Sequence, residues 1–194
     1  MSRVVAGATV RRWIALLGIA GIVVVLDQAS KAWVLANFEL GVPVQVVGDW
    51  LRIWYIQNAG ALFGLFQQSA VIFGVVSLVV IGVILWIHSR MATSGGWITT
   101  LGLGLLLGGA VGNVIDRFRF GYVVDFVDIG IGSWRFFTFN VADACIDIGI
   151  LILIVVALVP AIPARLGGVA PAPGSPGPAS GGDGAGAAGG GAAA

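Results

Sequence analysis

Four long apolar runs constrain this chain more than any other feature of its sequence. They cover approximately Trp13–Leu35, Ser69–Ile87, Trp97–Ile115 and Ala142–Val159. Each run is close to the ~20 residues that a helix needs to cross a hydrocarbon core of about 30 Å. Charged residues are only 10% of the chain and the mean hydropathy is +1.02, far from soluble proteins, where roughly 25% of residues are charged. The sequence therefore predicts a membrane all-α fold, a bundle of four transmembrane helices.

Two connecting segments are too long to be simple turns. Within the first, Val42–Ile56 is rich in β-branched and aromatic residues around Gly48 and Asp49, which predicts a β-hairpin. The second is predicted to contain a strand over Phe118–Ile129, a turn over 130–133 and another strand over Trp134–Phe139. Because two spans separate the segments, both lie on the same membrane face. A small β-sheet is therefore expected there.

The charges that flank the spans bear on the orientation of the chain. The first run is expected to be a retained span, because no small-residue cleavage site ends it and it meets Asp27 and Lys31. Lys and Arg residues divide equally between the two faces, but three Arg precede the first span, which favours a cytoplasmic N-terminus. Both termini are then cytoplasmic. Residues 1–165 are expected to form one domain and residues 166–194, nearly all Gly, Ala, Pro and Ser, a disordered tail.

Few residues in this chain can support covalent or acid–base chemistry. His88, Cys145 and Lys31 are the sole residues of their types. A zinc site therefore has too few ligands, and a Ser–His or Cys–His pair has too few bases. A Ser–Lys dyad would need Lys31, which is placed instead to pair with Asp27 at i, i+4. The net charge of +1 does not indicate nucleic-acid binding. We therefore predict no metal and no cofactor.

Carboxylates remain as the candidate catalysts. Acids at membrane depth are unfavourable and are usually functional or paired. Two neighbouring carboxyls do not ionise together easily, so one can keep a proton while the other acts as a base toward water. From spacing alone, an aspartyl enzyme and a small proton-coupled transporter explain the acids equally well. The acids within or close to spans are Asp27, Asp116, Asp125, Asp128, Asp143 and Asp147.

Each of these acids also has a purely structural interpretation. Asn140 and Asp143 have the spacing of a helix N-cap and an acid in the first helical turn. Asp125 and Asp128 are compatible with turn or strand-end acids. These interpretations compete with catalysis at the same positions, and spacing alone does not decide between them.

The third apolar run contains both a packing motif and polar residues. Gly104, Gly108 and Gly112 recur at intervals of four, which is typical of helices that approach closely in lipid. Asp116 and Arg117 follow at its end and could form an interfacial ion pair. We therefore expect this helix to pack tightly and to carry polar side chains at one end.

Five motifs follow one another along the chain. They are Asp27–Lys31, Asn58–Gly64, Gly108–Arg117, Gly121–Phe126 and Phe139–Asp143. Their order and spacing resemble those of the lipoprotein signal peptidases, the signal peptidase II family. The resemblance covers about Trp13–Val159. It implies a bacterial inner-membrane aspartic peptidase with four spans and a small extracytoplasmic β-sheet cradle.

The resemblance also implies a substrate and site residues. Asp125 and Asp143 match the catalytic pair. The polar residues around the pair match Asn58, Asn113, Arg117 and Asn140, and a supporting shell matches Asp27, Lys31 and Asp116. The implied reaction is removal of signal peptides from prolipoproteins, just before a cysteine that carries diacylglycerol. It takes place at the outer leaflet among membrane lipids and needs no metal.

The two other functional classes fit the motifs less well. A proton-coupled transporter needs acids along a path through the middle of the bundle, whereas these acids gather at one end. A non-enzymatic membrane-assembly subunit does not call for five polar motifs.

Overall fold

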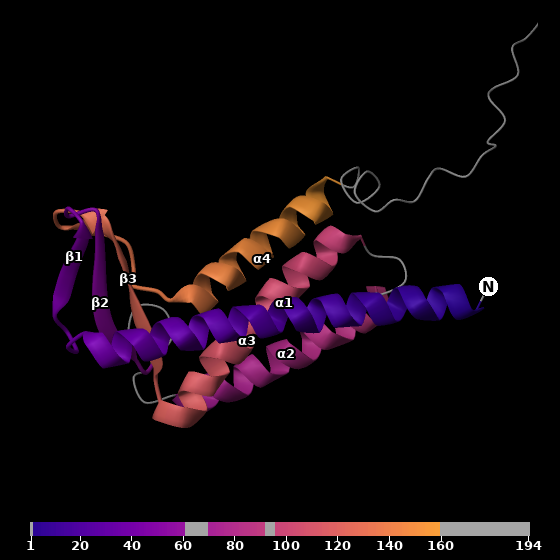
Figure 1. Ribbon diagram of the computed structural model, residues 1–194, viewed down its shortest axis with the longest axis horizontal. Helices are drawn as coiled ribbons and strands as arrows, with labels where there is room; N and C mark the ends of the chain where they lie inside the picture. Colours follow the sequence, from indigo (N-terminus) through magenta and orange to yellow (C-terminus); the bar gives the residue numbers. More distant parts are fainter. Residues whose placement is uncertain (1, 61–69, 92–95, 160–194) are drawn as a thin grey trace, which may run out of the picture.

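The computed structural model describes residues 2–60, 70–91 and 96–159. Figure 1 shows a bundle of helices with a small sheet at one end. The helices are α1 (Ser2–Asn37), α2 (Ala70–Met91), α3 (Trp97–Phe120) and α4 (Val141–Leu158), and the strands are β1 (Pro43–Val47), β2 (Leu51–Asn58), β3 (Val123–Ile131) and β4 (Trp134–Arg135). The predicted tail at 166–194 and the motif residues 61–64 lie outside the described residues.

In the described part of the chain, the four helices are each long and apolar enough to cross a membrane. The predicted bundle of four membrane-spanning helices is confirmed, and the helix α1 is longer at both ends than the first apolar run. α3 is the central helix, because 67% of its apolar window is buried, against 11–17% in the other three. The protein is therefore a multi-pass membrane protein whose other helices pack around α3 and turn most of their surface outward.

Small residues allow α3 to approach its neighbours closely. A Cβ on Gly108 would lie 2.8 Å from the carbonyl oxygen of Ala20 on α1, and a Cβ on Gly112 would lie 2.6 Å from Oδ2 of Asp27. A side chain at either position would force the helices apart. The expected close packing is confirmed, and at Gly112 the missing side chain makes room for a carboxylate.

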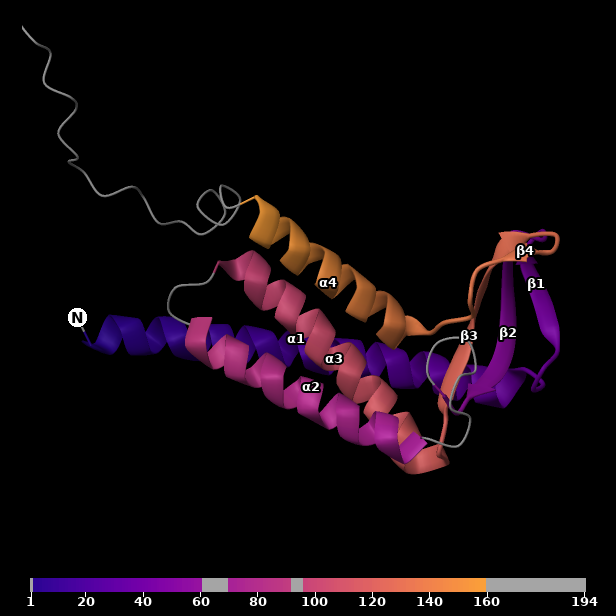
Figure 2. The same ribbon diagram turned by 180° about the vertical axis from the view of Figure 1, so that it is seen from behind.

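The sheet is antiparallel, with the order β1-β2-β3-β4. It lies across the end of the bundle where α1 ends and α4 begins (Figures 1 and 2). The predicted hairpin over Val42–Ile56 is confirmed as β1 and β2. The register of β2 against β3 shifts between Ile53 and Ile56, next to Asp125. This shift adds one residue to β2, an irregularity that redirects side chains beside functional sites.

The second connecting segment differs from its predicted strands at both ends. Phe118–Phe120 continues α3, and the helix ends at Gly121, whose φ of 79° and N–H bond to the carbonyl of Arg117 form a left-handed cap. The aromatic residues before Gly121 favoured a strand in the sequence. The helix nevertheless continues through them, because Gly121 is the first residue there that readily adopts the left-handed conformation of the cap. β4 contains only Trp134 and Arg135, and Phe139 forms an isolated bridge to Val127.

A buried ion-pair cluster fixes the outer part of the sheet. Asp128 is 1% exposed and lies inside β3, so its interpretation as a turn or strand-end acid was wrong. Its carboxylate accepts hydrogen bonds from Arg52 Nε on β2 at 2.7 Å and from Arg135 Nη2 on β4 at 2.8 Å. Burial alone would raise the pKa of Asp128, but the two guanidinium groups outweigh it and hold the pKa below its usual range. This cluster joins three strands.

Candidate active site

Two aspartates from different elements, a strand and a helix, line one cavity. Asp125 lies on β3 and Asp143 lies in the first turn of α4, and both border a cavity of about 750 Å³. The segment between them is held against β3, because Phe139 accepts the N–H of Val127 at 2.8 Å and donates its own to the carbonyl of Val127 at 3.1 Å. These bonds bring the start of α4 beside β3. We call this space the dyad cavity; its polar wall includes Gln57, Asn58, Ser77, Asn113, Arg117, Asp125, Thr138, Asp143 and Asp147.

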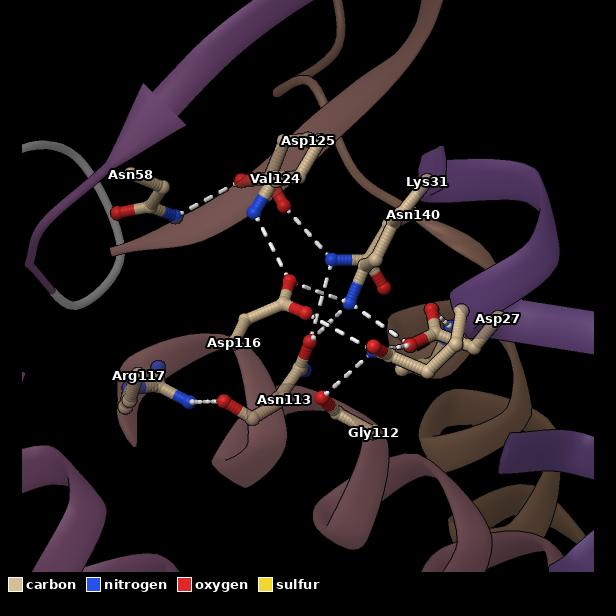
Figure 3. A network of polar contacts seen from close by, with 12 residues as sticks. Asp27, Lys31, Asn58, Gly112, Asn113, Asp116, Arg117, Val124, Asp125 and Asn140 are labelled. Atoms are coloured by element: carbon tan, nitrogen blue, oxygen red, sulfur yellow. Dashed lines mark hydrogen bonds and ion pairs between the residues drawn. The ribbon is translucent and has the colours of Figure 1, made fainter. Parts of the chain in front are cut away.

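Side-chain amides hold both oxygens of the Asp125 carboxyl group. Asn58 at the end of β2 donates to Oδ2 at 2.9 Å, and Asn140 donates to Oδ1 at 2.7 Å. Figure 3 shows these two side chains approaching Asp125 from different elements. Asn58 also accepts the N–H of Gly60 at 3.2 Å, which fixes which end of its amide faces Asp125. The Asp125 carboxyl therefore has a defined orientation.

Asp143 is held by the cap of its own helix and by α3. Asn140 is the N-cap of α4: its side chain accepts the N–H of Asp143 at 3.0 Å, and Asp143 Oδ2 accepts the N–H of Asn140 at 3.2 Å. Asn113 Nδ2 donates to Oδ1 of Asp143 at 2.8 Å. The capping interpretation is confirmed, and the same cap places Asp143 in the cavity.

Two neighbouring groups that donate hydrogen bonds to the Asn113 side-chain oxygen set the orientation of its amide. Its Oδ1 accepts from Lys31 Nζ at 3.1 Å and from Asn140 Nδ2 at 3.2 Å. A flipped amide would direct an NH₂ group at an ammonium, so Nδ2 must face Asp143. Figure 3 shows the dashed lines from Lys31 and Asn140 meeting at the side-chain oxygen of Asn113. One asparagine thus connects the buried lysine to a dyad aspartate.

Lys31 lies between two buried carboxylates. Its Nζ is 2.8 Å from Asp27 Oδ2 and 2.8 Å from Asp116 Oδ2, and no side chain of the three is more than 2% exposed. We call these three residues the buried triad. The expected pairing of Lys31 with Asp27 is confirmed. The ion pair suggested between Asp116 and Arg117 was wrong, because Asp116 points to Lys31 instead.

The acids of the buried triad also bind the backbone beside each dyad aspartate. Asp116 Oδ2 accepts the N–H of Val124 at 3.0 Å, and Asp27 Oδ1 accepts the N–H of Ala142 at 3.0 Å. Val124 directly precedes Asp125, and Ala142 directly precedes Asp143. One ion cluster therefore fixes the backbone of both aspartates, although β3 and α4 are separate elements.

Arg117 brings a cation to the dyad cavity. Its Nη1 donates to the carbonyl of Asn113 at 3.2 Å. Among the described residues it forms no ion pair within 4.0 Å, and its remaining N–H groups can bind a ligand in the cavity.

The environment of Asp125 changes its acidity. Burial, and then the nearby charge of Asp143, raise its pKa from 3.8 to about 7, although the amide donors Asn58 and Asn140 oppose the change. A carboxyl with such a pKa keeps its proton at pH values where ordinary carboxyls have lost theirs. Two close carboxyls that share one proton can perform general acid and general base catalysis together.

The structure brings together all nine residues predicted for the site. Gln28 was missed: its Nε2 donates to Asp116 Oδ1 at 2.9 Å and to the carbonyl of Gly112 at 3.3 Å. Its position beside Asp27 in a quoted motif was the available signal. In the described part of the chain, no group of three His, Cys, Asp or Glu side chains is placed to hold a metal ion.

Comparisons with known proteins agree on one family. The sequence profile described as signal peptidase (SPase) II matches residues 19–159. A lipoprotein signal peptidase of Moorella thermoacetica is 40% identical over 143 residues, which are 74% of this chain and 92% of that protein. One of Desulforapulum autotrophicum is 38% identical over 141 residues, 70% of this chain and 86% of that protein. A solved structure of a bacterial membrane enzyme matches with a TM-score of 0.68 and 29% identity, covering 77% of this chain and 90% of that one.

Proposed function

Because this chain belongs to the signal peptidase II family, we propose that it is an aspartic endopeptidase that removes signal peptides from bacterial prolipoproteins. The scissile bond lies just before a cysteine that already carries diacylglycerol. The proposal rests above all on one observation: Asp125 and Asp143 border the same cavity, each held by amide donors and by a common buried triad. Such a pair can supply both the general acid and the general base of metal-free peptide hydrolysis.

The chemistry follows from the different surroundings of the two carboxyls. Asp125, with its pKa of about 7, is the member that keeps the proton. Asp143, at the N-terminus of α4, is the base that takes a proton from water as the water attacks the scissile carbonyl. Asp125 then donates its proton to the carbonyl oxygen, and a tetrahedral gem-diol forms. Collapse of the gem-diol breaks the C–N bond: Asp143 gives its proton to the departing nitrogen, and Asp125 takes a hydroxyl proton as the new carboxyl group forms, which restores both aspartates.

The remaining polar residues are proposed to bind and orient. Asn58, Asn113 and Asn140 hold the two carboxyl planes, and Arg117 offers free N–H groups to carbonyl oxygens of the bound peptide. Peptide groups near the bilayer need such partners because no bulk water reaches them. The lipid chains of the substrate can stay in the bilayer beside the apolar wall of the dyad cavity, which includes Phe73, Val76, Val80 and Ile146.

We further propose that the protein lies in the inner membrane with both termini cytoplasmic and the dyad at the extracytoplasmic face. The three Arg before the hydrophobic part of α1 support this orientation. The N-terminus and the sheet lie at opposite ends of the bundle (Figure 1), so a cytoplasmic N-terminus puts the sheet outside. Exported precursors then reach the dyad from the outer leaflet.

Cleavage by the purified full-length chain in lipid bicelles tests the proposed function. A diacylglyceryl-modified prolipoprotein should be cut before its modified cysteine, and the unmodified precursor should not. Asp125→Asn and Asp143→Asn should each lower turnover by about 10³-fold or more, whereas Glu39→Gln, at an exposed acid outside the cavity, should not. Near-normal turnover in either dyad variant, or loss of activity with EDTA and its return with zinc, would contradict the mechanism.

Single cysteines in a Cys145→Ala background test the orientation. Cysteines at Gln45 and Ser133, both exposed in the sheet region, should react with an impermeant thiol reagent in cells whose outer envelope is permeabilised. A cysteine at Thr93, between α2 and α3, should react only after the inner membrane is broken. The reverse labelling pattern would refute the proposed orientation.

A further inference from the structure

One acid in the dyad cavity has no part in the mechanism above. Asp147 lies on α4 four residues after Asp143, and its exposed side chain borders the cavity. Because α4 runs away from the sheet (Figure 1), one helical turn places Asp147 about 6 Å further from the sheet along the helix axis than Asp143. Among the described residues, no hydrogen bond or ion pair reaches the carboxyl group of Asp147.

The buried acids outside the dyad each have a charged partner, whereas the exposed Asp147 has none among the described residues. Asp27 and Asp116 each bind Lys31, and Asp128 binds two arginines. Asp147 shares the lining of the dyad cavity with apolar side chains, which include Phe73, Val76 and Val80 of α2 and Ile146 of α4. A carboxyl at membrane depth is costly, and such residues are usually functional and have a partner. The partner of Asp147 is therefore to be sought in what fills the cavity.

Two polar groups of the cavity wall, those of Asp147 and Ser77, are placed to accept hydrogen bonds rather than donate them. Ser77 also borders the cavity, but its hydroxyl donates to the carbonyl of Phe73 at 2.8 Å, which leaves only its oxygen lone pairs. Asp147 offers its carboxyl oxygens. The free donors of Arg117 belong to the same cavity. The cavity thus offers donors from Arg117 and acceptors from Asp147 and Ser77.

An extended peptide presents the complementary pattern. Its N–H and C=O groups lie along the chain at about 3.3 Å per residue, and in an apolar environment each needs a partner. With the scissile bond at the dyad, the part of the signal peptide before that bond runs into the bundle. The 6 Å between Asp143 and Asp147 along the helix axis corresponds to about two extended residues.

We propose that Asp147 is a substrate-binding residue whose carboxyl accepts a backbone N–H of the signal peptide about two residues before the scissile bond. This inference rests on the proposed function. The bond fixes how far the peptide enters the cavity and therefore which peptide bond lies at the dyad. It also disfavours an acidic side chain at that point of the substrate, because the two like charges would repel each other.

Backbone esters in the substrate test the proposal. An ester in place of an amide removes one N–H and also weakens the adjacent carbonyl as an acceptor, so the comparison with an Asp147 variant is needed to isolate the N–H. With the wild-type enzyme, esters are placed in turn at each of the four residues before the scissile bond. One of them, about two residues before that bond, should lower kcat/KM by about tenfold or more, as expected for the loss of a bond to a charged acceptor.

The variant Asp147→Leu should itself lower kcat/KM for the all-amide substrate and should abolish the additional loss caused by that ester. Ile148→Leu is the matched control, because Ile148 is 51% exposed on the same helix and does not border the cavity; its ester penalty should equal that of the wild type. Asp147→Ala replaces Asp147→Leu if the larger side chain prevents folding.

The outcomes separate this inference from the function on which it rests. If the wild type cleaves no lipid-modified precursor, the proposed function itself fails. If the wild type cleaves but the ester penalty is unchanged in Asp147→Leu, or no ester position is penalised, Asp147 does not bind the peptide backbone and the inference is overturned while the peptidase assignment stands.

Discussion

Replacement of Asp125 by Asn should change the pH dependence of stability as well as activity. The wild-type carboxyl has a pKa of about 7 in the folded protein, against 3.8 ordinarily. The folded state therefore holds a proton that the unfolded state loses between pH 4 and 7, and wild-type stability falls as pH rises through this window. At 1.36 kcal/mol for each pH unit, the loss reaches about 4 kcal/mol. The side chain is 1% exposed, so solvent screening does not reduce this figure much.

The amide of Asp125→Asn cannot ionise, so this loss should be absent from the variant. The hydrogen bonds of the new amide determine how the stability of the variant compares with that of the wild type at low pH. Asn140 cannot flip, because its Oδ1 accepts the N–H of Asp143. The new amide must therefore direct its oxygen at Asn140 and its NH₂ at Asn58. Asn58 then has to flip and loses the N–H of Gly60, which costs about 1 kcal/mol.

We therefore expect Asp125→Asn to be slightly less stable than the wild type at pH 4 and about 3 kcal/mol more stable above pH 7. Denaturant unfolding in bicelles at several pH values measures this. Asp128→Asn is the matched comparison, because the contribution of Asp128 to stability should change with pH in the opposite direction. The pKa of Asp128 is lowered, so its stabilising contribution is present above pH 4 and fades as pH falls below it. Asp128→Asn should cost about 3 kcal/mol at neutral pH and less in acid.

The reasoning on Asp125 would be refuted by a stability difference from the wild type that stays constant between pH 4 and 8. Such a result would mean that the carboxyl ionises in the folded protein as readily as in the unfolded chain. Parallel slopes for Asp125→Asn and Asp128→Asn would refute it equally, because the two carboxyls have opposite surroundings.

Three further predictions concern rate, packing and the buried triad. The kcat/KM of the wild type should fall above pH 7 as Asp125 loses its proton, with an apparent pKa that belongs to the dyad as a pair; a flat profile to pH 9 would contradict this. Gly109→Ala should destabilise the protein by about 1–3 kcal/mol and lower activity, because its Cβ meets the Ala142 carbonyl at the start of α4; Gly82→Ala, in open space on α2, is the control and should not. Lys31→Met leaves two buried carboxylates without their cation and should cost about 3–5 kcal/mol in denaturant unfolding.

The sequence was most informative where local patterns have one physical cause. The four spans follow from apolar runs of sufficient length, and the cap at Asn140 follows from the chemistry of helix N-termini. The hairpin of β1 and β2 follows from β-branched residues around a turn. Each of these patterns is local, and each element was found close to its predicted position.

Long-range partners could not be predicted in the same way. The choice of Lys31 over Arg117 as the partner of Asp116 depends on how closely α1 and α3 approach, which is set by small residues such as Gly112. The limit of α3 at Phe120 depends on a left-handed cap at Gly121, which overrides the β propensity of the aromatic residues before it. The cluster around Asp128 could not be predicted without knowing the register of three strands.

Burial and the neighbouring carboxyl give a physical reason for a dyad that keeps one proton. Both raise the pKa of Asp125, because a buried charge is poorly solvated and because the charge of Asp143 repels a second one. The buried triad acts on geometry instead: it binds the backbone directly before both dyad aspartates, while its cation, Lys31, opposes the rise in the pKa of Asp125. Arg117 brings a second cation from the cavity side, and a bound peptide carbonyl would engage it. In the proposed mechanism the triad thus fixes the geometry of the dyad, while burial and the pair of carboxyls keep one acid and one base together.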